Sequence, residues 1–327
     1  MRETLVLLGA LALTFAATLQ ALPRAATAQA LSDKPIRILV PIAAGGATDL
    51  TARYVAQKLT ESLRRQVMVE NKPGGQYIPI LKELTGSAAD GHTIMMISTA
   101  MVVTQPMHPD YPFDLAKLTA ITEVSSGPMI LVARPSLGFK TAADLIAHAK
   151  ANPDKLTFGS GGGVSGTFSV ATELLKLRTG IKVKNVAYRG AALALNDLLG
   201  SHIDAMFDAM PVQVEQAKAG KVVPLMVTSA KRSSALPDVQ TSTEADIADF
   251  TVVNYFALLG PPGMPAPITQ QLRDEVAKAV RTPDAMAEFE KQGVNAIAGE
   301  PAALAALIQS DLARWAKVIK EAGIKPE

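Results

Sequence analysis

The chain has 327 residues, 48% of them hydrophobic and 19% charged, so it can bury a large apolar core, which excludes disorder over most of its length. Its 32 basic and 30 acidic side chains leave a net charge of +2 without any long run of Lys and Arg, which disfavours nucleic-acid binding. Since there is no cysteine, disulfides, thiolate catalysis and thiolate metal sites are excluded.

Residues 1–28 have the features of a secretory signal peptide. Arg2 precedes an uncharged apolar stretch from Leu5 to Leu19, and small-x-small cleavage patterns end at Ala28 and Ala30. The stretch has about 15 residues, against the ~20 that a membrane-spanning helix needs, which disfavours the alternative of a transmembrane anchor. We therefore expect cleavage after Ala28 or Ala30 and a mature protein in the periplasm.

Apolar strand patterns and helical periodicities alternate along the rest of the chain. In the first part, strands are predicted at 36–40, 67–69, 93–97 and 129–132, and helices at 50–63 and 141–149. In the second part, strands are predicted at 156–158, 183–187, 203–207, 222–227 and 255–259, and helices at 170–177, at 193–199 and between Pro211 and Gly220. Three helices follow, at 267–280, 283–291 and 301–321, each with a proline near its start.

This alternation predicts an α/β fold with mostly parallel sheets flanked by helices. At roughly 100–200 residues per domain, the length of the chain suggests two domains. We expect lobe 1 to comprise residues 29–130 plus 254–327, and lobe 2 to comprise residues 131–253. The C-terminal helices are assigned to lobe 1 because they form no closed core of their own.

Two glycine-rich loops, at 41–49 and 158–167, each follow a predicted strand and lead into a helix. Their small side chains leave backbone N–H groups accessible, and the N–H groups and positive dipole of a helix start favour an anion. Two such loops, one in each lobe, are suited to holding a carboxylate. Each loop alone is equally consistent with an ordinary tight turn, in which Thr48 or Asp49 serves as an N-cap.

The second loop also admits two enzymatic interpretations. Gly161, Gly163 and Gly166 match the dinucleotide fingerprint, but the next strand ends at Arg189 without the acidic residue expected about 20 positions later. Ser165 lacks the final glycine of a hydrolase nucleophile motif, which leaves a secreted α/β esterase as an alternative. The 4 histidines show no metal-ligand spacing, so we expect no metal and no cofactor.

Two charged residues near the predicted strand ends have both a binding and a structural interpretation. Arg189 can pair with a carboxylate through two guanidinium N–H groups, or it can be a surface charge. Asp208 can accept a hydrogen bond from a ligand or a bridging water, or it can cap the helix that starts at Pro211. The sequence leaves both choices open.

Short motifs at compatible spacing occupy residues 34–41, 43–49, 69–74, 89–93, 185–190, 207–208 and 227–233. Together they resemble the Bug/TctC-type extracytoplasmic solute receptors of the tripartite tricarboxylate transporter family, over almost the whole mature chain. The resemblance implies a two-lobed periplasmic-binding-protein (Venus flytrap) fold, a small organic carboxylate as ligand and membrane permease subunits as partners. We expect a monomer without enzymatic activity; the alternative to transport is a sensor that passes its signal to another protein.

In such receptors the loops of both lobes hold the carboxylate, partly through bridging waters. By position, the resemblance nominates as ligand-binding residues Ala44, Gly45, Gly46, Ala47, Thr48, Asp49, Ser98, Thr99, Ser160, Gly161, Gly162, Val164, Ser165, Gly166, Thr167, Tyr188, Arg189, Gly190 and Asp208. The chain departs from the family pattern at 73–79, where Gln-Tyr-Ile-Pro replaces a Gly-rich stretch, and at Val170, where a histidine is frequent. These departures leave room for a larger or less polar acid.

Overall fold

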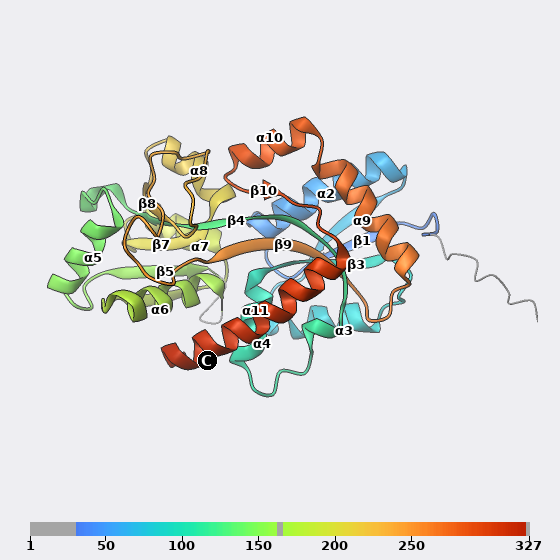
Figure 1. Ribbon diagram of the computed structural model, residues 1–327, viewed down its shortest axis with the longest axis horizontal. Helices are drawn as coiled ribbons and strands as arrows, with labels where there is room; N and C mark the ends of the chain where they lie inside the picture. Colours follow the sequence, from blue (N-terminus) through green and yellow to red (C-terminus); the bar gives the residue numbers. More distant parts are fainter. Residues whose placement is uncertain (1–30, 162–165, 325–327) are drawn as a thin grey trace, which may run out of the picture. The chain divides into compact units, whose positions relative to one another are not determined.

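The computed structural model describes residues 31–161 and 166–324 (Figure 1). The strands are β1 (Ile36–Val40), β2 (Val67–Asn71), β3 (Thr93–Ser98), β4 (Thr119–Ala133), β5 (Thr157–Gly161), β6 (Lys184–Tyr188), β7 (Ala205–Ala209), β8 (Val223–Val227), β9 (Val253–Gly260) and β10 (Asn295–Ala296). The α-helices are α2 (Ala47–Leu63), α3 (Ile78–Gly86), α4 (Thr99–Met107), α5 (Ala142–Ala151), α6 (Thr167–Thr179), α7 (Ala191–Leu199), α8 (Met210–Lys218), α9 (Ala266–Val280), α10 (Pro283–Lys291) and α11 (Pro301–Ala322). The predicted signal peptide and its cleavage sites lie outside the described residues.

The strands form one hydrogen-bonded path in the order β2-β1-β3-β9-β4-β7-β5-β6, with β8 and β10 also paired to β4. Pairs at both ends of the path are parallel, as predicted, namely β1 with β2 and β3, and β5 with β6 and β7. The centre is different, because β4 and β9 run antiparallel to each of their neighbours. The α/β prediction is confirmed, but the sheet is mixed rather than mostly parallel.

The long strand β4 and the returning strand β9 connect the two ends of this path. β4 pairs with β9 and β10 along its first part and with β7 and β8 from Met129 onward. The expected lobe boundary at residues 130 and 131 falls inside β4, and the boundary at 253 and 254 falls at the start of β9. Both crossings between the expected lobes therefore occur in strands that share one sheet.

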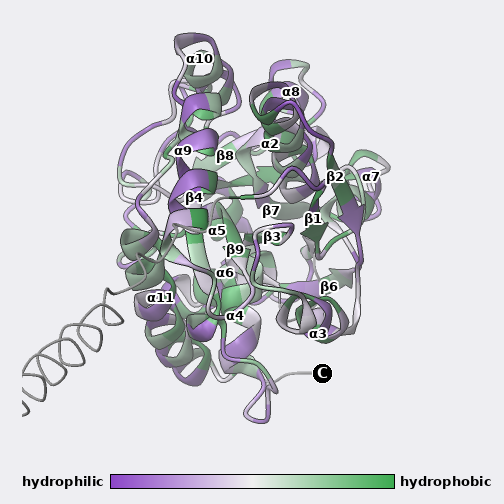
Figure 2. Ribbon diagram, turned by 90° about the vertical axis from the view of Figure 1, so that its right-hand side faces the viewer, coloured by the Kyte–Doolittle hydropathy of each residue, from purple (hydrophilic) through white to green (hydrophobic). Residues whose placement is uncertain are grey.

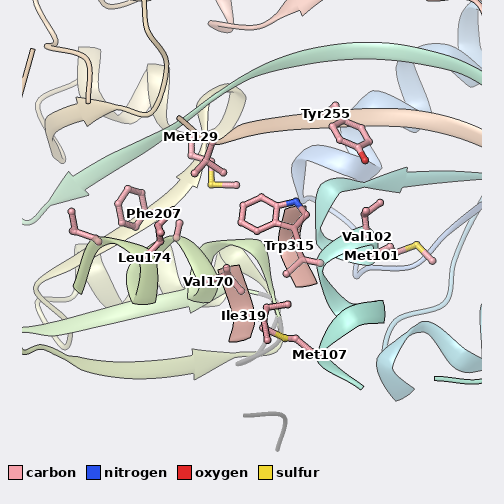
Figure 3. Close-up of a cluster of buried hydrophobic side chains, with 14 of the residues drawn as sticks. Met101, Val102, Met107, Met129, Val170, Leu174, Phe207, Tyr255, Trp315 and Ile319 are labelled. Atoms are coloured by element: carbon pink, nitrogen blue, oxygen red, sulfur yellow. The ribbon is translucent and has the colours of Figure 1, made fainter. Parts of the chain in front are cut away.

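Apolar side chains fill both faces of the sheet. Along β3, Ile94 and Met96 join one buried cluster while Met95 and Ile97 join another, as the alternation of a strand requires. Figure 3 shows the second of these clusters, where α11 contributes Trp315 between α4 on one side and β7 and α6 on the other. In Figure 2 hydrophilic residues lie mainly on helices such as α9, whereas β1 is coloured hydrophobic.

The helices cover the sheet, and the C-terminal helices pack against elements from earlier in the chain. α9 contacts α2 and β4, whereas α11 contacts α4, β4 and α6. The predicted N-cap of α5 is confirmed, since Thr141 and Asp144 form a reciprocal capping box. Within the described residues, none of the helices combines the length and the hydropathy that crossing a bilayer requires.

Candidate ligand-binding pocket

A cavity with about 690 Å³ of empty space lies beyond the carboxyl ends of β1, β3, β5, β6 and β7. This is the place where open α/β sheets bind ligands, because the loops and helix starts that follow the strands meet there. The lining consists of Ile42, Ala43, Ala44, Gly46, Ala47, Thr48, Tyr77, Ser98, Ala100, Gly161, Thr167, Phe168, Arg189, Gly190, Ala191, Ala192, Asp208, Ala209, Asn254 and Phe256.

Helices α2, α4, α6, α7 and α8 all begin at this cavity, and none of the five has a side-chain N-cap. By contrast, α5 and α10 start elsewhere and are capped by Thr141 and Thr282. The N–H groups of an uncapped first turn, together with the positive end of the helix dipole, attract an anion. The cavity therefore has several converging helix-start donors that no described side chain caps, apart from Ala209 N, which donates to Asp208 Oδ1.

Buried polar side chains in the lining also lack partners. The Thr167 hydroxyl is shielded from solvent, with the residue 2% exposed, and has no hydrogen-bond partner in ranges 31–161 and 166–324. Thr48, Ser98 and Asn254 are 4%, 8% and 6% exposed, and their side chains make no hydrogen bond among the described residues. Because buried polar groups are nearly always hydrogen-bonded, the Thr167 hydroxyl marks a position where a polar atom of a ligand or water belongs, and the other three side chains offer further hydrogen-bonding groups beside it.

Two charged side chains of opposite sign line the cavity. Arg189 is exposed and has no acidic partner in the part of the chain that the structure describes, so its guanidinium is available for a carboxylate. Asp208 is buried, and its Oδ1 and Oδ2 accept hydrogen bonds from Ala209 N at 2.8 Å and from Gln213 Nε2 at 2.7 Å. Burial nevertheless raises the pKa of Asp208 to about 6.

The second glycine loop needs glycine at one position for a steric reason. A Cβ at Gly161 would lie 2.5 Å from the backbone nitrogen of Ala191, at the start of α7. This close approach places the first turn of α7 directly at the end of β5. The sequence assigned this glycine to ligand access, whereas the structure adds a packing requirement.

The structure brings many of the sequence-predicted residues into the lining. These are Ala44, Gly46, Ala47, Thr48, Ser98, Gly161, Thr167, Arg189, Gly190 and Asp208. Gly45, Asp49, Thr99, Ser160, Gly166 and Tyr188 lie outside the lining. Gly162, Val164 and Ser165 are outside the described residues.

Asp49 supports the first loop from behind. Its carboxylate accepts hydrogen bonds at 2.9 Å from Gly45 N, from Arg53 Nε and from Asn71 Nδ2. Burial raises the pKa of Asp49, but the hydrogen bonds from Arg53, Gly45 and Asn71 outweigh it and hold the pKa below its usual value. The ionised Asp49 carboxylate therefore holds the first glycine loop in its conformation through these hydrogen bonds.

Three other residues outside the lining have comparable structural contacts. Thr99 Oγ1 accepts from Tyr255 N at 3.0 Å, which joins α4 to β9. Ser160 Oγ lies 2.6 Å from Asn185 Oδ1, and Tyr188 Oη donates to Asp197 at 2.5 Å. Val170, where the family often has histidine, is fully buried in the core and does not line the cavity.

Sequence reasoning missed ten lining residues: Ile42, Ala43, Tyr77, Ala100, Phe168, Ala191, Ala192, Ala209, Asn254 and Phe256. Four of them, Ala100, Phe168, Ala191 and Ala209, directly follow a predicted residue, so extending each loop into the first helical turn would have included these four and Ala192. The departure at 73–79 was a signal for Tyr77. For Asn254 and Phe256 the sequence offered none, because β9 reaches the cavity only through its pairing with β3.

The chain was compared with known proteins. The family model described as "Tripartite tricarboxylate transporter family receptor" matches residues 51–324. A Pseudomonas sp. (strain P51) protein described as "UPF0065 protein in tcbD-tcbE intergenic region" is 34% identical over 315 residues, which cover 95% of this chain and 92% of that protein.

Solved structures agree with this match. The periplasmic binding protein BugD superposes with a TM-score of 0.84 at 27% identity, covering 90% of this chain and 100% of that chain. The R. palustris protein Rpa4515, solved with adipate, has a TM-score of 0.85 at 28% identity, covering 90% and 99% of the two chains. The mixed α/β architecture described above is the fold of these periplasmic binding proteins.

Proposed function

Because the chain belongs to the receptor family of tripartite tricarboxylate transporters, we propose that it captures a small organic carboxylate in the cavity and delivers it to permease subunits of such a transporter. The family consists of solute-binding receptors and not of enzymes, so the esterase alternative is set aside. The relative Rpa4515, solved with adipate, supports a carboxylate as the class of ligand.

One observation carries the proposal: five uncapped helix starts surround a buried Thr167 hydroxyl, beside Arg189, and among the described residues that hydroxyl has no partner and that arginine no acidic partner. A dissociation constant near 1 µM corresponds to about 8 kcal/mol. Charge-assisted hydrogen bonds are worth roughly 1.5–3 kcal/mol each, so a few of them suffice. The site needs no buried cation to bind an anion and release it again.

In this proposal the ligand is enclosed by closure of two lobes. Lobe 1 (29–130 and 254–327) contributes the starts of α2 and α4, and lobe 2 (131–253) contributes those of α6, α7 and α8. Strands β4 and β9, which cross from one lobe to the other, would bend when the lobes close. Ligand binding would shift the population toward the closed form. The protein would act in the periplasm after cleavage of residues 1–28.

The experiment compares acids with their neutral amides. The protein is unfolded and refolded to remove carried-over ligand, and its thermal midpoint is measured with each compound of a matched panel. An acid should raise the midpoint because it binds only the folded state, whereas its amide should not. Equal shifts with acid and amide would contradict the proposal.

A variant pair tests the site itself. Arg189→Gln should weaken binding of the best acid by about 10- to 100-fold, the loss expected for one charge-assisted pair. Arg178→Gln is the matched control, because Arg178 is an exposed arginine at the far end of α6 and outside the lining. Uptake of the acid is then measured in cells that have this protein and in cells that lack it. Lower uptake in the cells that lack it indicates delivery to a permease, whereas equal uptake indicates a sensory role.

A further inference from the structure

The cavity contains aromatic rings that the comparison with the family motifs did not nominate. Tyr77, Phe168 and Phe256 line it together with Ile42, and they come from the start of α3, from α6 and from β9. Arg189 and Asp208 are the charged side chains of the described lining. Besides the helix starts and the polar side chains named above, a bound molecule therefore meets three aromatic rings and small apolar residues.

Tyr77 reaches the cavity through an unusual backbone segment. Gly74, Gly75, Gln76 and Tyr77 have successive φ angles of 103°, 59°, 52° and 67°. Such angles are ordinary for glycine but uncommon for residues with a side chain, and they persist only where the surrounding structure enforces them. Two hydrogen bonds do so here, from Tyr111 Oη to Gln76 O at 2.6 Å and from Tyr77 N to Gly74 O at 3.2 Å.

The Tyr77 ring is held on its other side as well. The side chain is 9% exposed, burial raises the pKa of its hydroxyl to about 12, and that hydroxyl is hydrogen-bonded to Thr104. A ring fixed at its backbone and at its hydroxyl has little rotational freedom left. It therefore presents a rigid surface to the cavity, which favours a rigid and complementary ligand.

The other two rings lie next to the groups that receive the carboxylate. Phe168 follows Thr167 in the first turn of α6, and Phe256 pairs with Ser98 in the register of β3 and β9. An acid held by the helix starts would thus place the atoms next to its carboxyl group against these rings. Ligand hydroxyl groups that point at the rings would face carbon and lose hydrogen bonds to water.

We infer, on the basis of the proposed function, that the pocket selects carboxylates whose body is an aromatic ring, and that Tyr77 is the residue that sets this selectivity. Ring–ring contacts are worth about a two- to tenfold change in affinity beyond the area that they bury. Aliphatic and hydroxylated acids of the same charge bind the same helix starts but forgo these contacts.

The test uses acid pairs that differ only in the saturation of the ring: benzoate against cyclohexanecarboxylate, and terephthalate against trans-cyclohexane-1,4-dicarboxylate. Affinities are measured by titration calorimetry on the refolded full mature chain, with adipate as the aliphatic reference. We expect at least one aromatic member to bind about tenfold more tightly than its saturated partner. Saturated members that bind as tightly as the aromatic ones overturn the inference.

Variants then assign the preference to Tyr77. Tyr77→Leu should reduce the aromatic-to-saturated ratio toward one, whereas Tyr77→Phe, which keeps the ring, should retain it. Tyr54→Leu is the control, because Tyr54 contacts Phe289 outside this lining. A ratio that Tyr77→Leu leaves unchanged, in a variant with the circular dichroism spectrum of the parent protein, overturns the role of Tyr77.

The outcomes separate this inference from the proposed function. If adipate binds and neither aromatic acid does, the inferred preference for aromatic acids is wrong, whereas the proposed carboxylate-binding function stands. If no acid of the panel binds, or acids and amides bind equally, the proposed function fails and the selectivity fails with it.

Discussion

Asp208 should make the folded protein less stable at neutral pH than under mildly acidic conditions. Its carboxyl group is buried, and burial raises its pKa from 3.8 to about 6. Between these two values the unfolded chain loses the proton while the folded chain keeps it, so stability falls as the pH rises through this window. At about 1.4 kcal/mol per pH unit, the ionised carboxylate costs the folded state on the order of 3 kcal/mol at pH 7.

The substitution Asp208→Asn should remove this cost. Asparagine keeps an oxygen for Ala209 N, and its amide can donate to Gln213 Oε1 once the Gln213 amide rotates; that buried oxygen has no partner within the described part of the chain. We expect the variant to gain up to about 3 kcal/mol over the parent at pH 7 and little at pH 4. A gain of this size fits a binding site that gives up stability for function.

The assay is urea unfolding followed by circular dichroism at pH values from 4 to 8, without ligand. The quantity compared is the free energy of unfolding of Asp208→Asn minus that of the parent protein, which removes the contribution of all other titrating groups. Asp110→Asn, an exposed aspartate outside the cavity, is the control and should give a constant difference. A pH-independent difference for Asp208→Asn as well would refute the reasoning.

Two further predictions concern packing and buried charge. Gly161→Ala should lower the free energy of unfolding by about 1–3 kcal/mol and weaken ligand binding, because the new Cβ meets the backbone of Ala191. Gly86→Ala is the control and should cause no loss in the same urea assay, because a Cβ at Gly86 has open space around it. Glu123→Gln should stabilise the protein at pH 7 more than at pH 4, since burial and the nearby Asp311 raise the pKa of Glu123. Identical gains in the free energy of unfolding at pH 7 and pH 4 would show that ionisation of Glu123 does not destabilise the folded protein.

Local sequence signals determined where most elements lie. The capping box of α5, the proline starts of α9, α10 and α11, and the apolar runs of β1, β3 and β7 are properties of a few neighbouring residues. Helices α3 and α4, the short strand β10 and the first part of β4 escaped prediction, and for α4 and β4 the reason is also local. The sequence of α4 is rich in Thr and Val and contains Pro106, and the middle of β4 contains Gly127 and Pro128, which interrupt a strand pattern.

The glycine loops likewise marked the starts of α2 and α6, but the sequence left open whether Thr48 or Asp49 caps α2, and only the structure shows those starts without a side-chain cap. The direction of β9, the mixed sheet and the aromatic part of the cavity were decided by tertiary structure alone. Ser98 and Phe256 become neighbours only when β9 inserts between β3 and β4, and Tyr77 enters the cavity only because Tyr111 and Thr104 hold it there. Short-range patterns specify elements, whereas the shape of a site depends on pairings between residues far apart in the chain.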